Sequence, residues 1–266
     1  MGYSRFTRYE LYENASRVLT ESDEKIRFKN IDELKEMFSD SAKLIKGFEE
    51  KVINDSNENS VNEFNTLFEM NSETVNDYFL VETVRENIQK QIEQKHRRNM
   101  GITYMDYFRF LLKSLANAQK KIINNNFIVT ENCEKVRDKR VQTFLSYAYD
   151  DKGLTLALFY YFWSRTGFLY IDWMWNNLNK NGRITKKTLN KSLKESEQLL
   201  FLRTTNSEMN IRGNNNIRQW CSWEIGNFYT NNKSKFYTSF YDKDRPKNDL
   251  LDSFSPMFDI EAGKIY

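Results

Sequence analysis

The chain has 266 residues, with 40 Lys or Arg against 37 Asp or Glu, so its formal net charge is +3 at pH 7. This balance argues against an obligate nucleic-acid binder, because such proteins carry a marked excess of basic residues. The only histidine is His96 and the two cysteines are Cys133 and Cys221, which excludes a zinc finger, a histidine-rich metal site and a disulfide scaffold. We therefore expect no nucleic-acid partner and no bound metal.

The N-terminal segment carries no targeting pattern. Residues 1–13 mix charged and aromatic side chains and lack the apolar core of a secretory signal. The longest apolar run, Leu154–Trp163, is well short of the roughly 20 residues that cross a bilayer. We expect a soluble, cytoplasmic protein with reduced thiols and no membrane partner.

The first half, residues 1–135, shows helical periodicity. Apolar residues recur at helical spacing over Val81–Ile92 and again over Phe108–Ile122. Thr103 followed three residues later by Asp106 resembles a capping box and marks the start of the second helix. Weaker helical patterns cover Leu34–Ile45 and Val61–Met70. This half is predicted to be an all-α helical bundle domain whose apolar stripes form a core.

From residue 136 onward the period changes, and all five tryptophans lie in this half. Short apolar or β-rich runs alternate with helix-like segments, which predicts an α/β domain with a parallel sheet over residues 136–266. The expected strands are Val141–Tyr147, Phe168–Ile171, Gln198–Leu202 and Phe236–Tyr241. The expected helices are Leu154–Ser164, Thr188–Ser196 and Ile217–Tyr229. Because ligands bind outside the carboxyl ends of such strands, function is expected at residues 146–151, 172–177 and 203–207.

Glu224 is the unusual residue of the last expected helix. It falls on the helical stripe where a hydrophobic residue would be expected, a stripe formed by Ile217, Trp220, Cys221, Ile225 and Phe228. One interpretation is structural, with the carboxylate reaching an arginine or a helix end. The other is functional, with the carboxylate presented to a cleft beside Trp220, a setting that perturbs a pKa. Cys221 is interpreted as a small buried hydrophobe, because no histidine is near it in the sequence.

Three segments together resemble a TIR domain. Phe144-Leu-Ser-Tyr147, followed by Asp150-Asp151, is similar to the F-[IL]-S-[YH] motif of the first strand in that family. Phe168–Trp173 is similar to the second strand, which ends in an Asp ahead of the BB loop. Trp220–Glu224 matches the W-C-x-x-E motif of a later helix. The match spans about residues 138 to 245 in the family's order and spacing. The resemblance implies a flavodoxin-like parallel sheet over 136–266.

The resemblance also implies a reaction and a site. In enzymatic TIR domains the Glu of W-C-x-x-E is the catalytic residue that cleaves the bond between nicotinamide and ribose in NAD+, and this role maps onto Glu224. The family's substrate pocket maps onto Ser146, Tyr147, Ala148, Asp172 and Trp173, with Trp220 as either a pocket wall or plain core. NAD+ is then the substrate, with no bound cofactor. Nicotinamide leaves as a neutral molecule from an oxocarbenium-like transition state, so one carboxylate suffices without histidine or metal.

The leading hypothesis is an antiphage enzyme resembling the TIR component of Thoeris defence systems. It would release nicotinamide and form a cyclic ADP-ribose isomer, which a nucleotide-sensing effector would detect downstream; hydrolysis to ADP-ribose stays open. The family architecture implies self-association through TIR domains. It also implies a sensing or assembly role for the helical half, which would respond to a phage-derived activator. A virulence enzyme that cleaves host NAD+ is a less favoured variant.

Two other functions remain as alternatives. In a non-catalytic TIR adaptor, Glu224 would be structural and the BB-loop region, Met174–Thr188, would be the working surface. A nucleoside deoxyribosyltransferase-like enzyme would also place a carboxylate at a glycosidic carbon, but would prefer free deoxynucleosides. Two segments depart from the family pattern: Asn206–Asn216 is longer than the usual approach to the motif helix, and the chain after Tyr241 is short for a last helix.

Overall fold

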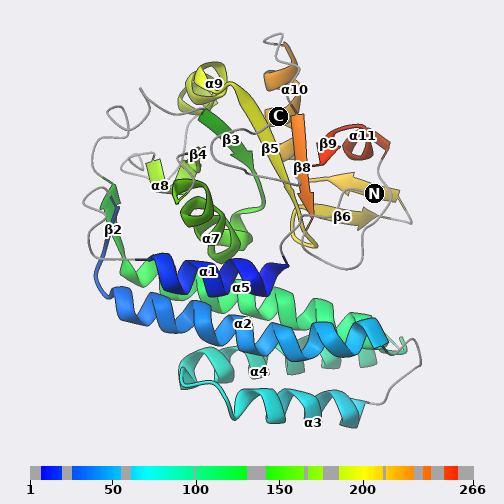
Figure 1. Ribbon diagram of the computed structural model, residues 1–266. Coiled ribbons are helices and arrows are strands. Elements are labelled where there is room, and N and C mark those ends of the chain that lie inside the picture. The colour runs from blue at the N-terminus through cyan, green and yellow to red at the C-terminus, as the bar shows by residue number, and fades with distance from the viewer. Residues whose placement is uncertain are drawn as a thin grey trace.

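The computed structural model describes residues 7–19, 26–54, 61–98, 100–130, 142–164, 167–175, 186–211, 214–230, 236–240 and 249–256. In these ranges a layer of helices lies beneath an α/β unit (Figure 1). The α/β class expected for the second half is confirmed. The boundary expected near residue 135 falls within residues 131–141, outside the described part of the chain, so the division into two domains stays a prediction.

The first half is mainly helical, as expected. Its helices are α1 (Arg8–Val18), α2 (Ile31–Asn54), α3 (Val61–Ser72), α4 (Tyr78–His96) and α5 (Tyr104–Asn126). The capping box at the start of α5 is confirmed: the Asp106 N–H donates to Thr103 Oγ1 at 3.2 Å, and the Thr103 N–H donates to the Asp106 carboxylate at 3.0 Å. The sole histidine, His96, lies exposed at the end of α4.

The all-helical prediction for the first half needs one correction. Strands β1 (Ile26–Phe28) and β2 (Phe127–Thr130) form an antiparallel pair. Both strands are short and lie far apart in the sequence, so no local periodicity could reveal them. The Phe127 ring packs 5.9 Å from Phe28 and 5.2 Å from Trp173, between ring centroids, and this links the pair to the second half.

A parallel sheet forms the centre of the second half. Its strands are β3 (Gln142–Ser146), β4 (Phe168–Tyr170), β5 (Gln198–Arg203), β8 (Phe236–Phe240) and β9 (Ser255–Pro256). Their spatial order is β4-β3-β5-β8-β9, and every neighbouring pair is parallel. All residues of β3 and β5 are buried, as expected for central strands covered on both faces. The four strands expected from the sequence are confirmed.

The remaining elements surround this sheet. They are η1 (Tyr149–Asp151), α7 (Lys152–Trp163), α8 (Asp172–Trp175), α9 (Lys186–Glu195), β6 (Glu208–Ile211), β7 (Asn214–Ile217), α10 (Gln219–Thr230) and α11 (Asp249–Asp252). Helices α7, α9 and α10 were expected. The long approach to the motif helix is an antiparallel hairpin, β6–β7. Most of the expected BB-loop region, residues 176–185, lies outside the described residues.

Helix α7 lies between the sheet and the helical layer (Figure 1). All of its residues from Lys152 to Phe162 are buried, because α1 and α5 cover the side that faces away from the sheet. Gly153 allows α5 to come close: a Cβ on Gly153 would lie 2.1 Å from Gln119 Oε1. One hydrophobic cluster therefore runs from the helical layer through α7 into the sheet.

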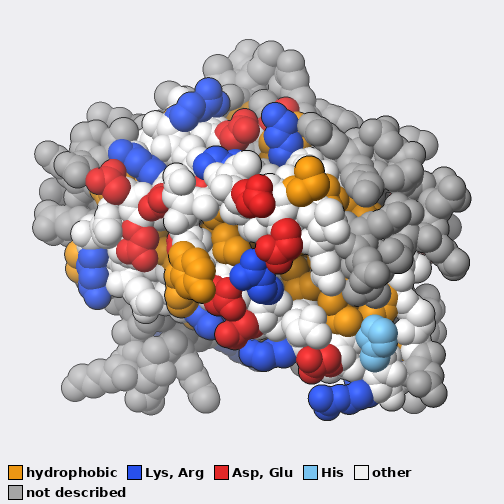
Figure 2. Space-filling model, turned by 90° about the horizontal axis from the view of Figure 1, so that it is seen from below, with side chains coloured by type: hydrophobic (Ala, Val, Ile, Leu, Met, Phe, Trp, Pro, Cys, Tyr) orange, Lys and Arg blue, Asp and Glu red, His pale blue; other side chains and the backbone are white. Residues whose placement is uncertain are grey.

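The outer face of the helical layer carries charges of both signs, interspersed with apolar side chains (Figure 2). Arg85 on α4 pairs with Glu69 on α3 at 2.9 Å and with Glu82 at 2.7 Å. Within the described ranges, no helix combines the length and apolar character required of a membrane span.

Candidate active site

Glu224 lies where α10 meets the carboxyl end of β3. Ser146 is the last residue of β3, and its Oγ donates a hydrogen bond to Glu224 Oε2 at 2.6 Å. Ser146 is fully buried and the Glu224 side chain is only 4% exposed. Among the described residues, no lysine or arginine forms an ion pair with Glu224. The described residues therefore do not support the structural interpretation in which Glu224 reaches an arginine.

Cys221 explains why Glu224 faces the strand end. Its buried Sγ lies 3.4 Å from the carbonyl oxygen of Tyr147, directly after β3. Residues three apart share one face of a helix, so Glu224 follows Cys221 onto the same strand end. The expectation of a buried Cys221 is confirmed. Burial, with Glu224 adding to it, raises the pKa of the thiol to about 12. At neutral pH the thiol is therefore held in its protonated form and not as the nucleophilic thiolate.

Trp220 departs from the expected apolar face. Its side chain is 41% exposed, and its ring stacks on that of Trp223 at a centroid distance of 5.2 Å. Of the two interpretations of Trp220, plain core is contradicted by this exposure, whereas Cys221 and Ile225 of the same helix are buried. Trp220 nevertheless belongs to the surroundings of Glu224, because its side chain lowers the pKa of that carboxyl.

A second carboxyl, Asp172, lies at the end of the neighbouring strand. It is the first residue of α8, just after β4, and is partly buried. The Tyr147 hydroxyl donates to Asp172 Oδ1, and the Trp173 N–H donates to the same oxygen at 2.7 Å. Tyr147 itself is buried. The ends of β3 and β4 are thus joined by a phenol–carboxylate contact beside Glu224.

The two carboxyls make this region unfavourable for negative charge. Burial raises the pKa of Glu224 well above its usual value, and Asp172 adds to the effect; hydrogen bonds from Ser146 and Trp220 oppose it. Burial also raises the pKa of Asp172, against the hydrogen bond from Tyr147. Burial and the nearby Asp172 raise the pKa of Tyr147, which keeps its hydroxyl protonated as a donor. A cation placed here would relieve the repulsion and lower both carboxyl pKa values.

The other two expected lining residues have different contacts. Trp173 is buried, and its indole N–H donates to Thr155 Oγ1 on α7 at 3.1 Å. Ala148 is buried in the turn before η1, where its carbonyl oxygen accepts from the Asp151 N–H at 2.9 Å. The structure therefore brings Ser146, Tyr147, Asp172 and Trp220 together with Glu224. It places Ala148 and Trp173 one residue from them in the chain, with contacts directed toward η1 and α7.

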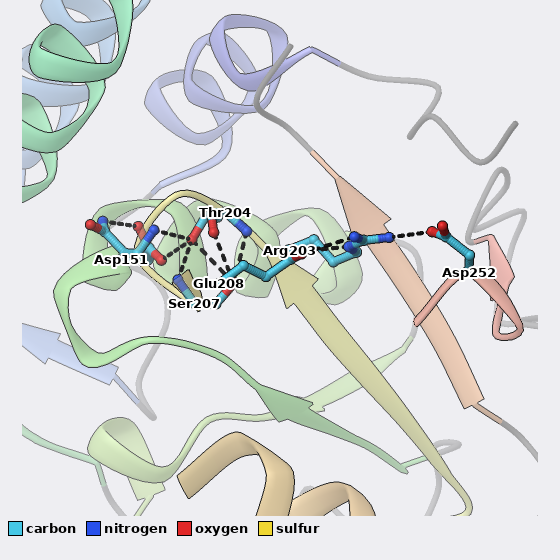
Figure 3. Close-up of polar contacts among 7 residues, drawn as sticks. Asp151, Arg203, Thr204, Ser207, Glu208 and Asp252 are labelled. Atoms are coloured by element: carbon cyan, nitrogen blue, oxygen red, sulfur yellow. Dashed lines mark hydrogen bonds and ion pairs between the residues drawn. The ribbon is translucent and has the colours of Figure 1, made fainter. Parts of the chain in front are cut away.

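A polar cluster joins the ends of β3 and β5 (Figure 3). The sequence indicated its residues only by their place after a strand. The buried carboxylate of Asp151 accepts hydrogen bonds from Thr204 Oγ1 at 2.6 Å and from Asn206 Nδ2 at 2.8 Å. The Thr204 N–H in turn donates to Ser207 Oγ at 2.8 Å. These bonds tie the loop after β5 to η1 and so hold the strand ends at a fixed spacing next to Cys221.

Arg203, at the end of β5, is the centre of a second network (Figure 3). Its fully buried guanidinium bonds both carboxylate oxygens of Glu208, at 2.6 and 2.9 Å, and Asp252 Oδ1 at 2.8 Å. These contacts fasten the β6–β7 hairpin and α11 to the central strand. The sequence indicated Arg203 only by its place after a strand, and it could not indicate the two partners, because both come from elements that were not predicted.

No group of three or more His, Cys, Asp or Glu side chains suited to a metal ion occurs among the residues the structure describes. No protein-family model matches the sequence, and a search of the curated proteins finds no match. The geometry around Glu224 and the three motifs are therefore what bears on function.

Proposed function

We propose that the chain is a TIR-type enzyme that cleaves the nicotinamide–ribose bond of NAD+, with Glu224 as the catalytic carboxylate. One observation carries the proposal: Glu224 is buried, is hydrogen-bonded to Ser146 at the end of the first sheet strand, and has no cationic partner among the described residues. A carboxyl that is kept from a cationic partner in the protein is suited to a cationic substrate.

The strand order supports a flavodoxin-like TIR sheet. Numbered along the chain, the sheet strands lie in the order 2-1-3-4-5. In this order ligands bind where the first and third strands diverge, outside their carboxyl ends. Those strands are β3 and β5, and β3 ends at Ser146. The W-C-x-x-E motif, on α10, is thus next to the switch point that the topology favours.

The proposed reaction starts from the positive charge of the nicotinamide ring. That charge favours the ionised form of Glu224, which the hydrogen bond from Ser146 also supports. The bond between the ribose carbon and the ring nitrogen then breaks, its electron pair goes to nicotinamide, and the ribosyl group acquires oxocarbenium character beside the carboxylate. Capture by water gives ADP-ribose and a proton, whereas capture by the adenine of the same molecule gives a cyclic isomer.

The biological role follows the resemblance to Thoeris TIR proteins. In this proposal the product is a cyclic ADP-ribose isomer that serves as a signal in antiphage defence. Self-association completes the active form, a phage-derived activator triggers it, and a nucleotide-sensing effector responds downstream.

The experiment compares the full-length protein with Glu224→Gln and, as a matched control, Glu195→Gln, which changes an exposed glutamate on α9. Concentrated protein is incubated with NAD+, with and without lysate of infected cells, and nicotinamide and nucleotide products are resolved by mass. We expect release by the wild type and the control, and loss of about a thousandfold or more in Glu224→Gln, as for removal of an essential catalytic group.

Other outcomes would assign other functions. If the folded, self-associating wild type releases no nicotinamide under any condition, the adaptor function replaces the enzyme. If free deoxynucleosides are cleaved in preference to NAD+, the deoxyribosyltransferase-like function replaces it.

A further inference from the structure

Helix α5 of the helical layer reaches the site region through Lys152. The Lys152 side chain is buried at the start of α7, and its Nζ donates to Asn124 Oδ1 on α5 at 2.6 Å. The ammonium lies 4.7 Å from the ring centroid of Trp173 and 4.8 Å from that of Tyr149. A cation held between two aromatic faces and an amide oxygen is fixed in place from three sides.

Lys152 also acts on Asp172. Its positive charge lowers the pKa of Asp172, opposing the effect of burial. The other groups that act on this carboxyl are the Tyr147 hydroxyl and the Trp173 N–H, while Glu224 is close enough to interact with it electrostatically. Lys152 is therefore the cation, among the described residues, that favours the ionised form of Asp172.

Burial lowers the pKa of Lys152 itself to about 8, with Asp172 opposing that effect and Lys120 on α5 adding to it. Lys120 pairs with Asp150, and Asp150 Oδ2 lies 3.7 Å from the Arg218 guanidinium at the start of α10. Helix α5 is thus linked to both sides of the site: to Asp172 through Lys152, and to the helix of Glu224 through Asp150 and Arg218.

We propose that Lys152 is a positioning residue through which α5 holds Asp172 beside Glu224 in the NAD+ site. The proposal rests on the proposed function, and it makes the helical layer part of the working site. A partner that displaces α5 would remove Asn124 from Lys152 and so disturb Asp172 without touching Glu224. Regulation by the helical half would then act through this contact.

A purely structural Lys152 would only fill space between the two rings. Lys152→Met keeps the aliphatic stem and removes the charge, whereas Lys152→Arg keeps a charge that does not titrate in the relevant range. Lys191→Met is the matched control, because it removes a mostly exposed lysine from α9. Thermal unfolding shows which variants are folded before they are compared.

The first measurement is kcat/KM for nicotinamide release by the full-length protein between about pH 6 and about pH 10, a range that brackets the titration of Lys152. We expect Lys152→Met to lower kcat/KM about tenfold at neutral pH, the effect of losing one charge interaction. Ionisation of Glu224 should raise kcat/KM with pH in all variants alike, and relative to Lys152→Arg the wild type should lose activity as pH rises through about 8, as Lys152 deprotonates. Lys152→Arg should retain activity near neutral pH and lack this decline. Profiles identical to the wild type in both variants would overturn the positioning role.

The second measurement does not depend on turnover. The Asp172 carboxyl is titrated by ¹³C NMR in aspartate-labelled protein, with Asp172→Asn to assign the signal. We expect the midpoint to move upward in Lys152→Met and to stay in place in Lys152→Arg and Lys191→Met. An unchanged midpoint in folded Lys152→Met would overturn the inference even in an active enzyme. A shifted midpoint in a protein that releases no nicotinamide would support the interaction between Lys152 and Asp172 while contradicting the proposed NAD+-cleaving function.

Discussion

Glu224 is a residue whose burial works against the stability of the protein. Burial raises its pKa well above the usual value near 4.5. At pH values between the usual pKa and the raised one, Glu224 is protonated in the native state but ionised in the unfolded chain. The free energy of unfolding therefore falls as pH rises through this window. The stabilising contribution of protonated Glu224 is fully present only below the pKa of the glutamate in the unfolded chain.

The same reasoning predicts that Glu224→Gln stabilises the protein while removing its activity. The amide can keep the hydrogen bond with Ser146 and carries no charge, so the penalty for ionising a buried group disappears. We expect a gain of about 1 kcal/mol near neutral pH, in the range of typical stabilising substitutions. Thermal melts at several pH values check this: the difference from the wild type should widen as pH rises. A difference that narrows with rising pH would contradict it, and Glu195→Gln should show no such trend.

At the scale of elements, the contact between α5 and α7 depends on the absence of a side chain at one position. Gly153 faces Gln119, and this glutamine cannot move aside freely. Its Oε1 accepts a hydrogen bond from the Tyr12 hydroxyl at 3.1 Å, and its Nε2 donates to Ser41 Oγ at 2.8 Å. One buried amide thus connects α1, α2 and α5 at the point where α7 packs on them.

We predict opposite effects of the same substitution at two helical glycines. Gly153→Ala should lower the free energy of unfolding by about 1–3 kcal/mol, as overpacking does, because the new methyl group would overlap Gln119. Gly226→Ala in α10 should be neutral or raise it by up to about 1 kcal/mol, since a Cβ there meets nothing within 4 Å and alanine favours the helix. Urea titrations of both variants measure the difference. Equal effects at the two sites would contradict this account of the α5–α7 contact.

At the scale of the whole molecule, the helical layer and the α/β unit share one hydrophobic cluster. The helices α1 and α5 cover the side of α7 that faces away from the sheet, and Lys120 and Asn124 add polar contacts to η1 and α7. Separating the two halves would expose the apolar face of α7 to water, which is unfavourable in proportion to the area uncovered.

We therefore expect the full-length protein to unfold in one cooperative transition. Calorimetry should show a single heat-absorption peak whose calorimetric enthalpy equals the van't Hoff enthalpy. Gly153→Ala should move this peak to lower temperature as a whole, because it weakens the contact shared by both halves. Two resolved peaks, of which only one responds to Gly153→Ala, would show that the halves unfold independently.

The local patterns of the sequence were sufficient for most elements of the second half. Runs such as Gln198–Leu202 and helical segments such as Leu154–Ser164 carry their periodicity within a few residues, so β5 and α7 were predicted. The β6–β7 hairpin was not, because the run Asn214–Asn216 has low β propensity and pairs through its backbone with Glu208–Ile211. Strands β1 and β2 were not predicted, because the two paired segments are separated in the sequence by most of the helical half.

The sequence by itself determined most helices and the central strands, and the unusual place of Glu224 on an apolar stripe, because periodicity and composition are local properties. Only the tertiary structure decided what surrounds that carboxyl. Ser146 reaches it because Cys221 packs α10 on β3, Asp172 lies nearby because β4 is the neighbour of β3, and Lys152 contacts α5 because Gly153 allows the close approach. These contacts join residues far apart in the chain, so their geometry depends on packing that no single segment encodes.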